Sequence, residues 1–330
     1  MTATPPGRRP PEDEPAGRYL RRRLMRHWHW GRTQGFSRLI EEDELNPFTR
    51  IPTAVSKWRW RRSNGVAQGS AVPVFLVGLQ RSGTNMLVRG LEASPEFEVH
   101  NENDPHAFHR FRLRSDHEVA AIVSASQHRY VLFKPLCDSH QIDRLLDELP
   151  VAAPGRAVWA FRDVDGRARS ALAKFGDSNL QVLRQVAAGE AGDRWQAQRL
   201  SEPHLALIRE FDYDTMSPAS AAALFWYVRN SLFFEMRLDE RDDVILSSYD
   251  AMVTDPEGNM RALCRFLGFP WRPQLTAHMA PRGGASRSAL DVDVAIRERC
   301  EDLRGRLEAT AAEQKRRLLI PREAEERTVG

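Results

Sequence analysis

The segment 74–91 constrains the fold of this chain more than any other part of the sequence. Residues 74–77 form an apolar, β-favouring run, which is typical of a strand buried on both faces of a parallel sheet. Apolar residues then recur at helical spacing up to position 91, so a helix is expected to follow. Gly78 and Gly83 lie between the two elements, where glycine lets the backbone turn its N–H groups inward. A loop of this kind at the start of a helix binds an anion, normally a phosphate.

The same loop departs from the mononucleotide-binding pattern G-x-x-x-x-G-K-[ST], in which a Lys contacts the β- and γ-phosphates and a hydroxyl holds magnesium. Gly78 and Gly83 keep the glycine spacing of that pattern. Thr84 and Asn85, however, occupy the positions of the Lys and of the Ser or Thr. The cation lies inside the loop instead, at Arg81. The loop is therefore P-loop-like, and it suits one 5′-phosphate group with a further substituent rather than a magnesium-bound triphosphate.

The bulk properties of the chain exclude several classes of protein. The net charge of +3 over 330 residues does not indicate a general polyanion binder, so no nucleic-acid partner is expected. The three cysteines are widely spaced and form no disulfide-like or metal-binding pattern, which favours a reducing, cytoplasmic setting. No apolar run reaches 18 residues, and there is no signal-peptide core, so neither a membrane span nor secretion is expected.

Composition divides the chain into four predicted segments. The basic, Trp-rich second segment is expected to pack on the main domain, with weak contact to a membrane surface as the alternative. The last segment is expected to cap the domain as a helix, with a homodimer contact as the alternative. The four segments are a disordered lead-in (1–17), a basic and mainly helical extension (18–70), an α/β domain (71–290) and a helical tail (291–330).

Alternating strand and helix patterns in the main domain predict an α/β fold with a parallel central sheet flanked by helices. Helix 218–238 reads as core, with Arg229 or Asn230 facing the cleft as an alternative. Further strands are expected at 98–100, 130–133, 157–161 and 243–248, and further helices at 142–149, 168–208 and 259–267. In such a sheet ligands bind beyond the carboxyl ends of the strands. The polar residues at those ends are Arg81, Lys134, Arg162 and Tyr249.

Two further motifs follow the loop. Arg162 lies at a predicted strand end, and Ser170 follows eight positions later in the next helix, so both side chains can meet one anion at the edge of the sheet. The third motif begins at Tyr249 and continues through Asp255-Pro256 to a Phe-Leu-Gly sequence that ends at Gly268.

Taken together, and in this order, the three motifs resemble those of the sulfotransferases that use 3′-phosphoadenosine 5′-phosphosulfate (PAPS). The resemblance covers roughly residues 73–285. It implies that the loop holds the 5′-phosphosulfate, that Arg162 and Ser170 hold the 3′-phosphate, and that Tyr249 lies against the adenine. The implied nucleotide-binding residues are Arg81, Ser82, Gly83, Thr84, Asn85, Arg162, Ser170, Tyr249, Arg282 and Gly283.

The chain also departs from this family. Met86 stands where the family has a bulky aromatic residue, and Leu136 stands where the cytosolic branch has its catalytic His. The family's Arg-Lys-Gly stretch is represented at best by residues 282–284. The catalytic His of the cytosolic branch is therefore absent, and the general base is expected at another position. A carboxylate or imidazole within hydrogen-bond reach of the acceptor is sufficient for this role. Glu102 is the preferred candidate, and the alternatives are His140 and His100.

The sequence thus predicts a transferase that moves the sulfuryl group from PAPS to an acceptor hydroxyl, in line and without a metal. Arg81 and Lys134 are expected to supply positive charge to the transferred group. His106 and His109 lack a third strongly placed ligand, so no metal site is expected there. The acceptor, which can be a glycan, a lipid or a small metabolite, leaves no readable pattern. The alternatives are a P-loop nucleotide kinase or NTPase, and a non-catalytic nucleotide-binding relative.

Overall fold

The computed structural model describes residues 47–279 and 288–319, which fall into two compact units divided between Gly65 and Val66. The described part of the first unit is helix α3 (Pro47–Asn64), with Arg61 and Arg62 in its last turn. The Trp-rich stretch of the predicted basic extension precedes α3 and lies outside the described residues. The second unit holds the sheet and every described residue discussed below.

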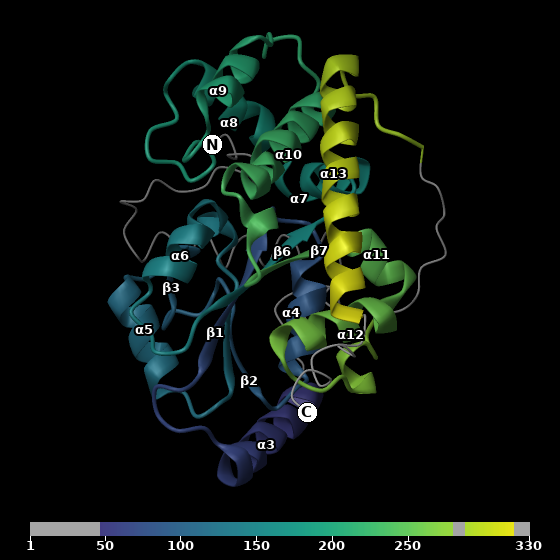
Figure 1. Ribbon diagram of the computed structural model, residues 1–330. Helices are drawn as coiled ribbons and strands as arrows, with labels where there is room; N and C mark the ends of the chain where they lie inside the picture. Colours follow the sequence, from purple (N-terminus) through teal and green to yellow (C-terminus); the bar gives the residue numbers. More distant parts are fainter. Residues whose placement is uncertain (1–46, 280–287, 320–330) are drawn as a thin grey trace, which may run out of the picture. The chain divides into compact units, whose positions relative to one another are not determined.

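Five parallel strands form the central sheet (Figure 1). Their order is β2-β5-β1-β6-β7. The predicted fold class is therefore confirmed. Side chains of β1 alternate between two apolar cores, because successive residues of a strand point to opposite faces. Burial on both faces explains the continuous apolar run of this strand. The strands are β1 (Val72–Gly78), β2 (Phe97–His100), β5 (Tyr130–Phe133), β6 (Arg156–Phe161) and β7 (Val244–Ser248).

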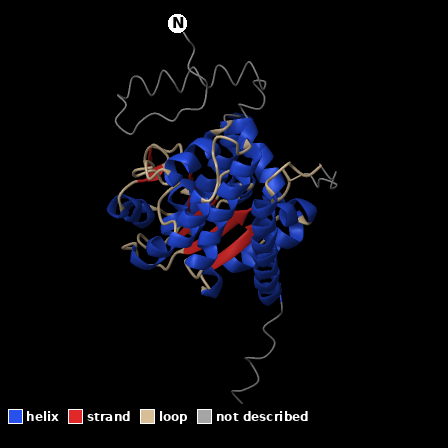
Figure 2. Ribbon diagram, turned by 90° about the horizontal axis from the view of Figure 1, so that it is seen from above, coloured by secondary structure: helices blue, strands red, loops and turns tan. Residues whose placement is uncertain are grey.

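Helices enclose this sheet, as the view in Figure 2 shows. One face is covered by α4 (Thr84–Glu92) and α12 (Pro256–Leu267), whose buried apolar side chains join those of Val74 and Leu76. The apolar core on the other face includes side chains of α5 (Asp116–Ala125), α6 (Ile142–Glu148), α10 (Pro218–Glu235) and α13 (Val294–Leu319), among other helices. The predicted terminal helix thus packs one apolar face on the domain, and α13 contacts α10 and β7. Within the described ranges, no helix is both long and apolar enough to cross a membrane.

The long helix expected over residues 168–208 was wrong. The region folds as α7 (Val164–Phe175), α8 (Ser178–Ala187) and α9 (Glu202–Arg209), with turns between α8 and α9. Gly176 ends α7 with a φ of 58°, and Gly189 and Gly192 also have positive φ. These glycines interrupt a periodic apolar pattern that by itself reads as continuous helix.

Four short elements complete the edge of the sheet where the strands end. They are the hairpin strands β3 (Phe108–His109) and β4 (Arg112–Leu113), the 3-10 turn η1 (Leu136–Gln141) and helix α11 (Tyr249–Thr254). Ser139 of η1 fixes the end of β1, since its hydroxyl accepts from the N–H of Gly78 at 2.9 Å and donates to the Gly78 carbonyl at 3.0 Å.

Replacing Gly78 with Ala is expected to destabilise the fold by about 2–4 kcal/mol. The φ of Gly78 is 115°, and an added Cβ would lie 2.2 Å from the backbone oxygen of Ala160 on β6. Gly305→Ala is the matched control, because Gly305 lies within α13 with nothing within 4 Å of an added Cβ. We expect this control to stabilise by about 0.5–1 kcal/mol. Equal free energies of unfolding for the two variants, measured in denaturant, would contradict the packing described.

Candidate functional site

The loop between β1 and α4 has the backbone of an anion-binding turn. Gly78, Arg81 and Gly83 adopt positive φ values of 115°, 74° and 85°. Arg81 is not a glycine, so its left-handed conformation costs about 1–3 kcal/mol and requires support from its surroundings. Strained residues of this kind concentrate at binding and catalytic sites.

The start of α4 offers unused hydrogen-bond donors to this loop. Gly83 is the N-cap and provides no side-chain cap. The N–H groups of Thr84 and Asn85, the first helical residues, have no intrahelical partner. The Ser82 hydroxyl is buried and has no hydrogen-bond partner among the residues that the structure describes. These N–H and hydroxyl donors and the dipole of α4 together favour a bound anion at the start of the helix.

Arg81 is held by a residue that lies 89 positions later in the chain. Its Nε donates to the Ser170 hydroxyl of α7 at 2.8 Å. The sequence grouped Ser170 with Arg162, and the structure joins Ser170 to Arg81 instead. The first and second motifs thus meet directly at the loop.

Tyr249 connects Arg162 to the same loop. The Arg162 guanidinium lies over the Tyr249 ring, 4.3 Å from the ring centroid. The ring also packs on Gly83, where an added Cβ would lie 2.4 Å from a ring carbon. Nε of Arg162 is buried and makes no hydrogen bond within the described part of the chain, with the Asp163 carboxylate 3.6 Å away. The second and third motifs therefore also meet beside the loop.

Two acidic residues fix the turn that carries Arg162. Asp163 caps α7 by accepting from the Gly166 N–H at 2.6 Å. Asp250 accepts from the backbone N–H of Asp163 at 2.8 Å. Burial, together with the nearby Asp163 charge, raises the pKa of Asp250 to about 6. These carboxylates are committed to positioning the backbone after β6.

Lys134 brings a further cation to the start of α4. It follows β5, the neighbour of β1, and is buried. Its Nζ donates to the Asn85 side-chain oxygen at 2.7 Å. The ammonium group thus lies beside the first turn of α4, as expected for a residue at that strand end.

The three candidates for the general base have different environments. His100 lies between Glu98 and Asp104, with its two ring nitrogens 3.2 and 2.6 Å from their oxygens. Burial lowers the pKa of His100, but these two carboxylates outweigh burial and raise it. A protonated His100 cannot accept a proton. Glu102 lies two residues beyond β2 and is partly buried.

His140 lies in η1 and is almost fully buried. Burial, followed by the charges of Arg229 and Arg112, lowers its pKa to about 3. It is a neutral imidazole at physiological pH and a weak proton acceptor. Neither imidazole is therefore suited to accept a proton, and Glu102 stays a prediction.

Two further predictions from the sequence concern the C-terminal glycine-rich stretch and a metal site. Arg282 and Gly283 lie outside the described residues. No group of three or more His, Cys, Asp or Glu side chains within 47–279 and 288–319 could hold a metal ion. The backbone N–H of His106 instead donates to Asp104, at 2.9 Å.

Arg167 is a site residue that the sequence did not single out. Only 1% of it is exposed, and its Nε donates to the backbone oxygen of Gln80 in the loop at 3.3 Å. Its other acceptors are neutral oxygens of Asn179 and Ala222. No carboxylate of the described chain lies within ion-pair distance, and burial together with Arg81 lowers its pKa to about 9. The three-residue spacing from Arg167 to Ser170 places both on one face of α7 and could have revealed it.

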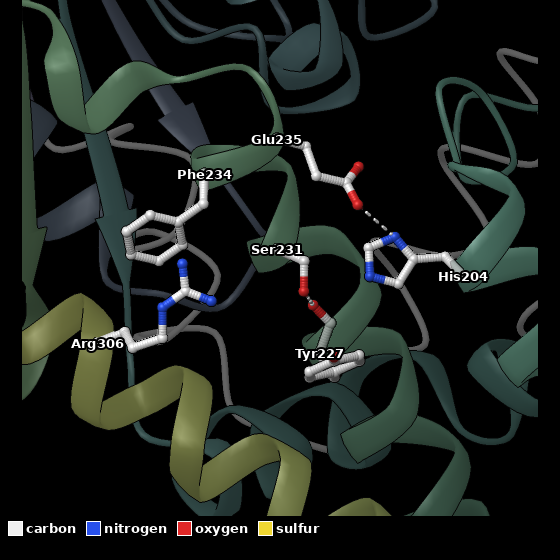
Figure 3. A pocket seen from close by; sticks show the side chains of 6 residues that line it. All are labelled: His204, Tyr227, Ser231, Phe234, Glu235 and Arg306. Carbon is white, nitrogen blue, oxygen red and sulfur yellow. Dashed lines mark hydrogen bonds and ion pairs between the residues drawn. The ribbon is translucent and has the colours of Figure 1, made fainter.

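A separate pocket of about 300 Å³ opens among α9, α10 and α13 (Figure 3). Glu235 and Ser201 both contact the same ring nitrogen of His204, at 2.9 and 3.0 Å. A serine nucleophile and its acid must contact opposite nitrogens of the His, so this cluster is not a catalytic triad. The pocket is lined by His204, Tyr227, Ser231, Phe234, Glu235 and Arg306, and by none of the predicted site residues.

Comparisons with known proteins add little to this geometry. The chain matches no protein-family model and no curated protein. It is similar to a solved sulfotransferase domain from the curacin biosynthetic pathway, with 12% identity and a TM-score of 0.42 over 72% of this chain and 98% of that one. It is also similar to the sulfotransferase domain of the Synechococcus PCC 7002 olefin synthase, with 14% identity and a TM-score of 0.34 over 76% and 96%. Likeness at this level carries no argument about activity, which rests on the residues above.

Removing the charge of Arg167 is expected to weaken anion binding at the loop. Sulfate should raise the melting temperature of the wild type, and Arg167→Gln should lose most of that rise, with affinity about tenfold lower. Asn179→Ala is the control, since it removes a neutral partner of Arg167 and leaves the charge. Each variant is compared with itself without sulfate, so altered stability does not confuse the result. An unchanged sulfate-induced shift in Arg167→Gln would contradict this role.

Proposed function

We propose that the protein is a PAPS-dependent sulfotransferase, which moves the sulfuryl group of PAPS in line to an acceptor hydroxyl and releases adenosine 3′,5′-bisphosphate. One observation carries the proposal: three motifs, whose first residues are more than 80 positions apart in the sequence, meet at one loop. Arg81 contacts Ser170, and Tyr249 contacts both Gly83 and Arg162. A nucleotide with a phosphate at each end of its ribose requires two such cationic positions.

The loop suits the phosphosulfate end of this donor. The uncapped N–H groups at the start of α4 and the Ser82 hydroxyl supply hydrogen bonds to non-bridging oxygens. Arg81 and Lys134 supply positive charge, Arg81 from within the loop and Lys134 beside Asn85. Charge builds on the bridging oxygen as the sulfuryl group leaves, and fixed cations there stabilise the transition state more than the ground state.

The Arg162–Tyr249 pair suits the nucleoside end. Arg162 is assigned to the 3′-phosphate, for which its buried Nε is available. Ser170 is assigned to the same phosphate, and its hydroxyl also accepts a hydrogen bond from Arg81. Tyr249 offers its ring to the adenine. The residues that follow in the predicted set, Arg282 and Gly283, are assigned here only by the sequence resemblance.

Glu102 is assigned as the general base. The acceptor hydroxyl must lose its proton as it attacks sulfur, and a carboxylate within hydrogen-bond reach accepts it. Two observations favour Glu102 over the imidazoles: His100 is paired with two carboxylates, and the pKa of His140 is about 3.

A nucleotide kinase or NTPase fits this site less well. Thr84 takes the position of the phosphate-binding Lys, and Asn85 that of the magnesium-binding hydroxyl. The carboxylates at the ends of β6 and β7, Asp163 and Asp250, bind backbone N–H groups. A non-catalytic nucleotide-binding relative is the second rival, and it differs from the proposal only in the acceptor chemistry.

Thermal unfolding with two nucleotides separates the proposal from the kinase. Adenosine 3′,5′-bisphosphate at about 100 times its dissociation constant should add about 2.7 kcal/mol of stability, whereas magnesium-bound ATP should add little. Arg81→Ala should lose most of the gain. Arg89→Ala, which removes an exposed arginine on the same helix, should keep it. Stabilisation by magnesium-bound ATP alone would overturn the proposed function.

Changing Glu102 to Gln tests the catalytic assignment. We expect transfer from labelled PAPS to hydroxyl compounds in cell-extract fractions to fall by about 100- to 10,000-fold. Stabilisation by adenosine 3′,5′-bisphosphate should be unchanged, because Glu102 is not assigned to the nucleotide. Full transfer activity in this variant would remove Glu102 from the mechanism. Absence of any labelled product with the wild type would instead favour the non-catalytic relative.

A further inference from the structure

Two consecutive residues of one turn hold two consecutive residues of another at the carboxyl edge of the sheet. Tyr249 and Asp250 begin α11 directly after β7, and Arg162 and Asp163 follow β6, which is the neighbour of β7. The Arg162 guanidinium lies over the Tyr249 ring, and the Asp250 carboxylate accepts from the Asp163 N–H at 2.8 Å. The position of Arg162 therefore depends on both residues of the second turn.

The Arg162 guanidinium folds back over the first turn of α7. A Cβ added at Gly166 would lie 2.7 Å from its Nε and 2.9 Å from its Nη2. The Asp163 carboxylate is close to the same point, with Oδ1 accepting from the Gly166 N–H at 2.6 Å and Oδ2 lying 3.6 Å from the Arg162 Nε. One guanidinium thus lies beside the Tyr249 ring and beside a carboxylate that caps a helix.

Two carboxyl groups share the charge of this one guanidinium. Asp163 and Arg162 are the charged residues that act most on the Asp250 carboxyl. With Asp163 and Asp250 both ionised, the two turns carry one negative charge more than Arg162 can balance. With Asp250 protonated, Arg162 and Asp163 balance each other.

The elements that pack closely on α11 are β7 and α12. β7 has no titratable side chain. On α12, burial raises the pKa of the Cys264 thiol to about 12, so this thiol is neutral. Glu257 and Arg261 pair with each other at 2.7 Å, and Arg265 donates to a backbone oxygen of α13 at 3.0 Å. The charge state of Asp250 is therefore governed by burial and by the β6–α7 turn.

The Asp250 carboxyl titrates close to neutral pH. Burial raises its pKa to about 6, and the Asp163 charge adds to this rise, whereas the Asp163 N–H and the Arg162 charge oppose it. A phosphate bound on Arg162 would bring further negative charge to the same place and raise the pKa of Asp250 again. By linkage, such a phosphate binds more tightly where Asp250 is already protonated.

We propose that Asp250 is a positioning residue for Arg162, and that it takes up a proton from solvent as the 3′-phosphate of the nucleotide binds. The inference rests on the proposed function, which assigns that phosphate to Arg162. Asp250 holds the Asp163 N–H with one oxygen and receives the proton on the other. Protonation leaves the turn with one negative charge fewer, so that the guanidinium attracts the phosphate more strongly.

Calorimetric titration at pH 5 and pH 8 tests this role. Asp250→Asn is the neutral mimic, because its amide oxygen can still accept from the Asp163 N–H. At pH 8 the variant should bind adenosine 3′,5′-bisphosphate about 3- to 30-fold more tightly than the wild type, because it lacks the opposing charge. At pH 5 the two should bind alike. The phosphates of the ligand ionise identically in both experiments, so the ratio of the two affinities reports on residue 250.

Two controls separate this effect from a general change in structure or charge. Adenosine 5′-phosphate lacks the 3′-phosphate, so the two proteins should bind it alike at both pH values. Asp255→Asn removes a carboxylate at the other end of α11, where it caps α12 by accepting from the Gly258 N–H at 2.9 Å. This variant should keep the wild-type affinity for adenosine 3′,5′-bisphosphate at both pH values.

A ratio of affinities that is the same at pH 5 and pH 8 would overturn the inference, as would an equal gain in the binding of adenosine 5′-phosphate. Asp250→Ser, which is also neutral and keeps an acceptor, serves if Asp250→Asn does not fold. Failure of the wild type to bind adenosine 3′,5′-bisphosphate at either pH counts against the proposed function itself. Binding without the pH-dependent difference counts against the role of Asp250 alone.

Discussion

The packing of the Tyr249 ring on Gly83 holds the two halves of the candidate site together. The Tyr249 ring contacts Gly83 in the loop after β1, and the Arg162 guanidinium lies 4.3 Å from the centroid of the same ring. Any side chain at position 83 would separate them, because an added Cβ would lie 2.4 Å from a ring carbon. The glycine therefore has two roles: it allows the positive φ of the loop, and it brings a residue 166 positions later against the phosphate-binding turn.

Buried arginines that form no ion pair with the described residues are the electrostatic feature of this edge of the sheet. Arg167 and Arg229 are both almost inaccessible to water, and their recorded acceptors are neutral oxygens. Keeping a cation in such a place is costly unless a negative group arrives to balance it. An anion bound at the loop beside Gln80 would lower this cost for Arg167.

The sequence predicted the elements that local pattern determines. The β1–loop–α4 unit, the strand-end positions of Lys134 and Arg162, and the parallel sheet all follow from apolar runs and glycine spacing. Ser170 was grouped with Arg162 at an anion site, and its hydrogen bond to Arg81 was not foreseen, since spacing along α7 does not reveal contacts with the loop after β1. Arg167 was missed because arginine is seldom buried, so its burial depends on contacts from the loop and α10 that only the fold reveals.

The choice of the general base shows the same limit of prediction from sequence alone. Sequence position favoured Glu102 and left His100 and His140 open, and their chemical environments separate them only in three dimensions. The two carboxylates around His100 come from β2 and the following turn, whereas the cations around His140 come from β4 and α10. Arg229 was one of two residues thought able to face the cleft, and it is buried, with its Nη1 donating to the backbone oxygen of Gln198.

The central claim is that one nucleotide spans Arg81 and Arg162. A crystal structure of the protein with adenosine 3′,5′-bisphosphate tests it most directly. The account predicts the 5′-phosphate at the start of α4 beside Arg81, the adenine against Tyr249, and the 3′-phosphate on Arg162. A nucleotide bound away from the carboxyl ends of β1 and β6, or one that reaches only one of the two arginines, would contradict it.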